Sequence, residues 1–423
     1  SSVPRGRGRE GAGLRVSGPR VRGAGTLACL GTCKEARGVG MAASWRAHLR
    51  KLARAALDAV ALERAAALDA VALERANWAM ERATALPEVW ALVAKHRGFV
   101  GAWQLMRVCR ASRAGAKEFL STLQGLVVCG GMIAGAGPVS DVWRLDLATM
   151  RWDPMPALVT ARYSHACCAV RGTLVVLGGI SPVSSVSSVE MLSSSEEEGG
   201  AFVDLPPLSR GKIYVAAAIA VDESDSAAGQ VLLLGRYDGS TVLTTVQLVD
   251  LATGACAPQP GLLRRRCNPV AGRLPHGRVV CAGGTGGDDS SSAEVWRPPA
   301  QGAPDAAWSW RALSAMSAER HACCGCVMSD GRFAVLGGHS NGGGPTASCE
   351  ALVVDDGVAH WVPLPPMHDA RASFACGAVA GCVLVAGGAG LKSAELYDVE
   401  LNRWLRLPRD LPHDLAYMGS ALL

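Results

Sequence analysis

The sequence predicts an all-β body, a six-bladed β-propeller closed by its C-terminal strand, preceded by an α-helical N-terminal segment. A strand-length apolar run that ends in glycine recurs six times between residues 125 and 423. The recurrence is about 50 residues long, which is typical of propeller blades. Hydrophobic residues make up 49% of the chain and charged residues 19%. This composition supports a large core and excludes wholesale disorder.

The first 124 residues divide into three pieces, of which two precede residue 84. Residues 1–40 are rich in Gly and Arg without apolar periodicity, which predicts a disordered leader. An organelle transit peptide is the alternative. Residues 41–83 contain no Gly or Pro and repeat LDAVALERA at 57–65 and 68–76. An 11-residue repeat keeps its apolar side chains near one helix face, so we expect a helix that either binds a partner helix or serves as a solvated spacer.

Charge is distributed unevenly along the chain. Residues 1–124 hold 21 Lys and Arg against 9 Asp and Glu, whereas the remainder holds 21 against 28. A basic N-terminal part could attract nucleic acid or an acidic protein. No recognised nucleic-acid-binding module accompanies the charge, which argues against nucleic acid.

The cysteines favour a reducing compartment. The chain has 15 of them, an odd number. Most lie in apolar strand-like runs, where Cys behaves as a small hydrophobic residue. Adjacent pairs such as Cys167-Cys168 would point to opposite faces of a strand, which argues against a zinc site. We therefore expect reduced thiols in the cytoplasm or nucleus, and the lack of an 18-residue apolar run argues against a membrane span.

Residues 84–124 read as two or three short helices, opened by a proline that a first helical turn tolerates. The pattern LP, then spaced apolar residues, then VCR at 108–110 resembles an F-box. In that family the short helices bind the adaptor subunit of a cullin-type ubiquitin ligase. The resemblance assigns adaptor binding to Leu86, Pro87, Val93, Leu105, Val108 and Cys109. The alternative is a helical cap packed on the propeller.

The repeat of residues 125–423 has two markers. Five of its apolar runs end in a glycine pair and the third ends in Gly235-Arg236; the first glycines are Gly130, Gly178, Gly235, Gly283, Gly337 and Gly387. Residues without Cβ suit a tight turn beside a neighbouring sheet. Downstream, pairs of residues seven apart recur at Leu145/Trp152, Val249/Cys256, Val354/Trp361 and Tyr397/Trp404. Together these markers resemble the kelch repeat, whose aromatic side chains pack between propeller blades.

The segment LAYMGSALL at 415–423 aligns with the inner strand of a further repeat. The first run, LVVCGG at 126–131, has no strand before it. We therefore expect the C-terminal strand to complete the first blade and to close the ring.

One arginine precedes each inner strand in five of the six units, namely Arg162, Arg210, Arg266, Arg320 and Arg371. Arginine recognises carboxylates with two parallel hydrogen bonds, and in kelch-like ligase adaptors such residues bind acidic peptides. We therefore predict an arginine-lined mouth that binds an acidic segment of a target. The alternative is that each arginine pairs with a nearby Asp or Glu within the repeat.

The remaining alternative is a propeller oxidoreductase with a copper site. Galactose oxidase, a kelch propeller, needs tyrosine and histidine ligands for copper. Here His165 and His321 begin similar HACC strands and could approach one another, but no tyrosine arrangement accompanies them. The sequence favours a cofactor-independent binding protein: a substrate receptor of a cullin-type ligase, or a kelch scaffold without a ligase link.

Overall fold

The computed structural model of the chain describes residues 51, 54, 82–193, 200–209, 216–221, 228–237, 239–286, 290–297, 309–340, 343–355 and 358–423. The predicted leader of residues 1–40 lies outside these ranges, and so does nearly all of the predicted helix of residues 41–83. The described part is mostly β-structure with few helices. This finding confirms the predicted mostly-β body.

Two helices occupy the segment for which short helices were predicted. α3 spans Pro87–Leu105 and bends at Gly98, whose φ of +68° is non-helical. α4 spans Arg110–Ser121. It begins in a capping box in which Cys109 Sγ accepts a hydrogen bond from the Ser112 N–H, and Ser112 Oγ accepts one from the Cys109 N–H.

The described residues form six four-stranded antiparallel sheets, which we number along the chain. The first sheet has the order β27-β1-β4-β5, with strands Gly419–Leu422, Leu126–Cys129, Val142–Asp146 and Arg151–Met155. The second sheet, β6-β7-β8-β9, comprises Ala166–Val170, Thr173–Leu177, Val189–Leu192 and Phe202–Leu205. The third, β10-β11-β12-β13, comprises Ala217–Val221, Gln230–Tyr237, Val242–Asp250 and Cys256–Gln259.

The other three sheets repeat this meander. The fourth, β14-β15-β16-β17, comprises Val270–Arg273, Val279–Ala282, Ala293–Arg297 and Ser309–Ala312, with the short 3-10 helix Pro275–Gly277 between its first two strands. The fifth, β18-β19-β20-β21, comprises Cys324–Val327, Phe333–Leu336, Cys349–Asp355 and Val358–Leu364. The sixth, β22-β23-β24-β25, comprises Ala375–Val379, Cys382–Ala386, Ala394–Asp398 and Arg403–Arg406. A small sheet, β26-β2-β3, joins Leu415–Ala416, Met132–Ile133 and Gly137–Pro138.

The second strand of each sheet is the apolar run that ends in glycine. In β1, β15, β19 and β23 every residue is buried. Such strands are covered on both faces, as a continuous apolar run predicts. The core therefore lies between neighbouring sheets, where clusters such as Val127, Cys129, Leu174 and Val176 join side chains of the first and second sheets.

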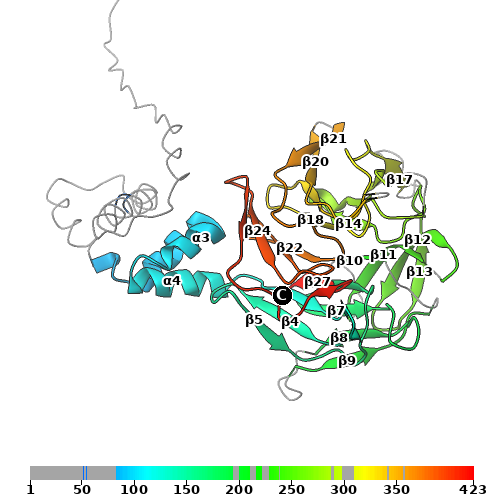
Figure 1. Ribbon diagram of the computed structural model, residues 1–423, viewed down its shortest axis with the longest axis horizontal. Helices are drawn as coiled ribbons and strands as arrows, with labels where there is room; N and C mark the ends of the chain where they lie inside the picture. The colour runs from blue at the N-terminus through cyan, green and yellow to red at the C-terminus, as the bar shows by residue number, and fades with distance from the viewer. Residues whose placement is uncertain are drawn as a thin grey trace, which may run out of the picture. The chain divides into compact units, whose positions relative to one another are not determined.

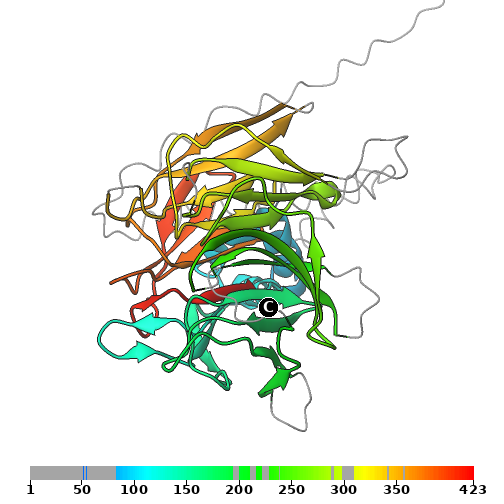
Figure 2. The same ribbon diagram turned by 90° about the vertical axis from the view of Figure 1, so that its right-hand side faces the viewer.

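The first strands of the sheets contact one another in chain order: β6 meets β10, and the contacts continue through β14 and β18 to β22. β27 contacts both β22 and β6. Figure 1 shows this red strand near the green β7, and Figure 2 shows it between the orange sheet and the cyan one. Within the first sheet, β27 pairs with β1 and sets Leu126 opposite Leu422.

The predicted spacing of paired residues holds in three hairpins and fails in one. Leu145 lies opposite Trp152, Val249 opposite Cys256, and Tyr397 opposite Trp404. In the fifth sheet, however, Trp361 faces Leu352 rather than Val354. The reason is a tighter hairpin, because β20 and β21 stay paired as far as Asp355 opposite Val358.

Candidate functional site

The arginines predicted to line a mouth are buried inside the sheets. Arg162, Arg266, Arg320 and Arg371 are at most 2% exposed, and Arg210 lies outside the described residues. For these four, the predicted role of binding an acidic partner at a mouth is therefore wrong. Instead, each of these arginines pairs with an acidic residue of its own repeat, which is the alternative given above.

Each of the four guanidinium groups forms an ion pair with a buried glutamate on the third strand of its own sheet: Arg162 with Glu190, Arg266 with Glu294, Arg320 with Glu350 and Arg371 with Glu395. We call this contact the Arg–Glu clamp. Charges removed from water must be compensated by hydrogen bonds as well as by a partner charge. The clamp meets this condition, as the sixth sheet illustrates.

In the sixth sheet, Arg371 Nη1 donates to the carbonyl oxygens of Gly387 at 2.8 Å and Ser393 at 2.7 Å. The carboxylate of Glu395 accepts from Arg371 Nη2 and from the His368 N–H, both at 2.8 Å. Burial acts to raise the pKa of Glu395, but the hydrogen bonds from Arg371 and His368 outweigh it and lower that pKa overall. The clamp thus fixes the loop before β22 to β24.

The glutamates were not predicted from the sequence, although a local signal marks them. Each lies in a Ser-x-Glu triplet: Ser188 to Glu190, Ser292 to Glu294, Ser348 to Glu350 and Ser393 to Glu395. Each also faces the residue two positions before the first glycine, as Glu395 faces Val385. The number of residues between the glycine and the glutamate varies with the length of the intervening loop. A search for a constant spacing in the sequence therefore does not find the glutamates, although their position in the strand register is constant.

The clamp is replaced in two of the sheets. At the same register, Trp143 faces Val128 in the first sheet and Gln247 faces Leu233 in the third. Leu415 stands where the other repeats have arginine, because its carbonyl accepts from the Gly388 N–H as Arg162 accepts from Gly131. The first sheet therefore substitutes an apolar pair for both charged partners together.

The glycine pair is required where one sheet meets the next. Gly130 and Gly131 have φ of +56° and +104°, a region that favours residues without Cβ. A Cβ on Gly130 would lie 2.6 Å from the carbonyl oxygen of Arg162. The Gly131 N–H donates to that same oxygen at 2.8 Å. Each such arginine consequently connects two sheets, one through its side chain and the other through its carbonyl.

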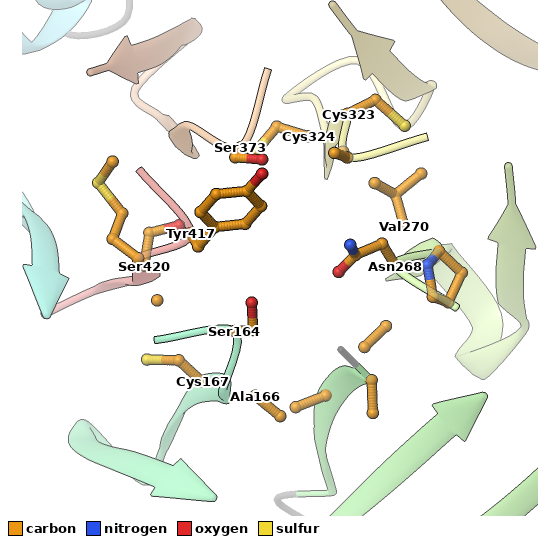
Figure 3. Close-up of a pocket in the computed structure, with 18 of the residues that line it drawn as sticks. Ser164, Ala166, Cys167, Asn268, Val270, Cys323, Cys324, Ser373, Tyr417 and Ser420 are labelled. Carbon is orange, nitrogen blue, oxygen red and sulfur yellow. The ribbon is translucent and has the colours of Figure 1, made fainter. Parts of the chain in front are cut away.

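A cavity of about 260 Å³ lies where the first strands begin. Its lining comes from all six sheets, from residues 164–167, 216–218, 268–271, 322–325, 373–374, 376 and 417–420. Ser164, Asn268, Ser373 and Tyr417 surround it (Figure 3). Each of these residues lies two positions after the repeat's arginine, or after Leu415 in the first sheet. The residues that line the cavity are therefore close in sequence to the arginines that were predicted to do so.

These lining residues share an uncommon backbone conformation. The φ angles of Ser164, Asn268, Ala322, Ser373 and Tyr417 lie between +50° and +56°. Backbone hydrogen bonds connect them across sheets, from Ser164 N–H to Tyr417, from Tyr417 N–H to Ser373 and from Ser373 N–H to Ala322. Such strained positions persist only where surrounding contacts fix them, and they concentrate at functional sites.

The described lining of the cavity carries hydroxyl, amide and thiol groups and the imidazole of His165, but no Lys, Arg, Asp or Glu. Groups of this kind donate and accept hydrogen bonds without a fixed charge. The cavity is therefore suited to an uncharged polar segment, in contrast to the acidic segment that the sequence analysis predicted.

The helical residues assigned to adaptor binding fall into two groups. Val93 and Leu105 are buried, whereas the remainder are at least partly exposed: Leu86, Pro87, Val108 and Cys109. Leu86 is 51% exposed, and Leu92 nearby on α3 is 62% exposed. Leu86 is the residue before α3 and Leu92 lies on it, so the start of this helix exposes apolar side chains that a partner could cover.

α3 also packs against the sixth sheet. Phe99 is buried, and a Cβ on Gly98 would lie 3.8 Å from the carbonyl oxygen of Ala380. The backbone N–H of Val100 hydrogen-bonds to the thiol of Cys382. The second half of α3 therefore contacts the turn between β22 and β23 and the start of β23.

The histidines compared with an oxidase site have separate neighbours. His321 stacks on His339 with ring centroids 5.4 Å apart, while His165 Nε2 lies 3.5 Å from Cys129 Sγ. Within the described ranges, no group of three His, Cys, Asp or Glu residues is placed to hold a metal ion. Nor does any helix of the described part have the length and apolarity to cross a bilayer.

The recurring clamp and the four-stranded antiparallel sheets define a β-repeat protein. A sequence profile for the Kelch motif matches residues 161–198, which include Arg162 and Glu190. Kelch-like protein 34 of Homo sapiens is 25% identical over 302 residues, or 67% of this chain and 45% of the relative. Both matches support the kelch repeat that the glycine-ended runs predicted. The chain matches about half the length of this curated relative.

Proposed function

We propose that the chain is a protein-interaction module in which the six sheets are blades of a closed propeller and the central cavity receives a segment of a target protein. The observation that carries this proposal is the set of left-handed residues that surrounds the cavity. Hydrogen bonds between sheets hold their backbone, so little backbone entropy remains to be lost on binding. Kelch repeats and the kelch-like relative support an interaction role.

Closure by β27 is supported by two observations. β27 pairs with β1 along all four of its residues. Its contacts with β22 and β6 complete the cycle of first strands. A ring of this kind leaves no inner sheet edge available for pairing with other chains.

Target binding is tested by capture of cellular proteins on the full chain and quantification by mass spectrometry. We expect Tyr417→Ala combined with Asn268→Ala to lose the specific targets, because both side chains line the cavity. Tyr237→Ala, which alters a tyrosine absent from the cavity lining, is the control. Targets retained by the double variant, with its unfolding midpoint unchanged, would contradict the proposal.

We further propose that the α3–α4 segment recruits the adaptor of a cullin-type ligase, so that the propeller presents a substrate. The support is the exposed pair Leu86 and Leu92, together with the F-box resemblance. The contacts of α3 with the sixth sheet favour a second candidate, a helical cap without a ligase link.

Capture on the full chain separates the two candidates. If Leu86 and Leu92 contact the adaptor, Leu86→Ala with Leu92→Ala should reduce adaptor recovery at least about tenfold, since each exposed leucine can contribute about 1–2 kcal/mol when covered. Leu263→Ala is a matched control, because this leucine is similarly exposed, at 55%, but lies in the loop before β14 and not on the helical segment. Adaptor missing from the unaltered chain would leave the cap as the role of the helices.

A further inference from the structure

Cys129 and Cys167 belong to different sheets, yet their sulfur atoms lie side by side. Cys129 is the last residue of β1, and Cys167 lies on β6. The two Sγ atoms are 3.5 Å apart, and Cys129 Sγ is also 3.5 Å from His165 Nε2. A Cβ on Gly419 would lie 2.5 Å from that nitrogen, so the glycine in β27 leaves room for this group of three.

The two thiols share their protons unequally. A hydrogen bond from Cys167 lowers the pKa of Cys129 to about 6 against the effect of burial, with further help from His165 and Arg162. The same hydrogen bond, together with burial, raises the pKa of Cys167. The pair therefore releases one proton near neutral pH and retains the other. A thiolate, unlike a thiol, is a strong nucleophile.

The pair is reached from the cavity. Cys167 is partly exposed and lines the cavity beside Ser164 (Figure 3). Cys129 is fully buried behind it. A small oxidant in the cavity would thus meet the sulfur of Cys167 first, with that of Cys129 within reach.

We propose that Cys129 and Cys167 form an oxidative modification site that reacts with a hydroperoxide and closes into a disulfide between the first and second sheets. The proton of Cys167 first moves along the hydrogen bond to the Cys129 thiolate, 3.5 Å away, and the resulting Cys167 thiolate, which faces the cavity, attacks the peroxide. An S–O bond forms and the O–O bond breaks, and the departing alkoxide or hydroxide takes up from the solvent the proton that the pair had released, leaving as alcohol or water. The sulfur of Cys167 is now a sulfenic acid.

The second step consumes the remaining thiol. Cys129 loses its proton to His165, and its thiolate attacks the sulfur of Cys167, so that an S–S bond forms and the S–O bond breaks. The departing hydroxide takes the proton from His165 and leaves as water. Two thiols and one hydroperoxide thereby give one disulfide, one alcohol or water, and one further water.

Other thiols of the chain provide an internal comparison. Burial raises the pKa of Cys281 and of Cys323 to about 12, so both should react slowly. A disulfide between Cys129 and Cys167 would tie β1 to β6 beside the strand that completes the first sheet. It would also remove a thiol from the cavity wall.

The test uses the reduced full chain treated with equimolar hydrogen peroxide, then alkylated, digested and mapped by mass spectrometry. We expect the cross-linked peptides of Cys129 and Cys167 as the first product, at least about tenfold ahead of oxidation at Cys281. Uniform oxidation of all thiols, or a first disulfide between other cysteines, would overturn the proposal. Because this measurement uses the unaltered protein, it does not depend on the folding of any variant.

Two variants refine the assignment. Cys167→Ala should abolish the cross-link, whereas Cys281→Ala, the matched control, should leave it unchanged. His165→Asn should slow disulfide formation at pH 7 and recover at higher pH, where the thiol ionises without the imidazole. A rate that His165→Asn leaves unchanged at every pH would remove the histidine from the proposed sequence of steps. The inference is independent of the target and ligase proposals.

Discussion

Replacing Arg371 by leucine tests whether the clamp stabilises the propeller body. The guanidinium group of Arg371 donates to the backbone of Gly387 and Ser393 and to the side chains of Ser393, Asp369 and Glu395. Without it, the fully buried carboxylate of Glu395 loses its cationic partner. Leaving one charge of a buried pair uncompensated costs about 3–5 kcal/mol.

The measurement is the thermal unfolding of the full chain followed by circular dichroism. A loss of this size should lower the midpoint by on the order of 5–10 °C in a body of this length. Arg151→Leu is the matched control, since Arg151 is exposed on β5; we expect its effect to stay within about 0.5 kcal/mol.

A double-variant cycle with Glu395→Gln then isolates the ion pair. Glutamine can still accept from the His368 N–H, and the third sheet already carries Gln247 at this register. We expect the double variant to lose about 2–3 kcal/mol less than the sum of the single variants, because no unpaired charge remains. Additive losses, or an Arg371→Leu protein that melts like the unaltered chain, would refute the structural role of the clamp.

Three further outcomes follow from the structure. The hydrogen bond from Arg406, opposed by burial and aided by Ser393 and Arg371, lowers the pKa of Asp369 to about 2; since the unfolded value is about 4, this stabilisation is complete above pH 4 and is lost as the pH falls toward 2. Arg406→Ala should remove about 1 kcal/mol of it, visible as a smaller fall of the unfolding midpoint between pH 4 and 2. Gly115→Ala would place a Cβ 2.1 Å from the Pro87 carbonyl oxygen, so it should destabilise the packing of α3 on α4 by about 2 kcal/mol; unchanged hydrogen exchange in residues 87–121 would contradict this. Removal of residues 415–423 should lower the unfolding midpoint and broaden the transition, whereas an unaltered melting curve would argue against closure by β27.

The body of the fold was predictable because its signals are local. Continuous apolar runs predict strands buried on both faces, and glycine pairs mark the contacts between sheets. The role of the arginines was not predictable from their spacing, because a charge at the start of a strand can point into the sheet or into the cavity. The glutamates determine that the arginine side chains point into the sheet. They lie on a strand whose separation from the arginine along the chain varies from repeat to repeat.

The cavity-lining residues were hidden for a different reason. Ser164, Asn268, Ser373 and Tyr417 are three different residue types and form no sequence motif, and what all four share is a positive φ. Backbone conformation of this kind is imposed by the contacts between sheets. Similarly, the approach of Cys129 to Cys167 depends on the packing of the first sheet against the second, which a single sequence does not encode in any local pattern.

The pairing of β27 with β1 also sets an order of assembly. During synthesis the residues of β1, β4 and β5 emerge before those of the other five sheets, yet the first sheet gains its inner strand only after residues 419–422 have been made. Closing so long a loop carries a large entropic cost. Strands β22 and β6, once folded, flank the position that β27 occupies, and their contacts with β27 offset part of this cost. We therefore expect this sheet to be the slowest to become protected in refolding, because its two parts come from opposite ends of the repeat array.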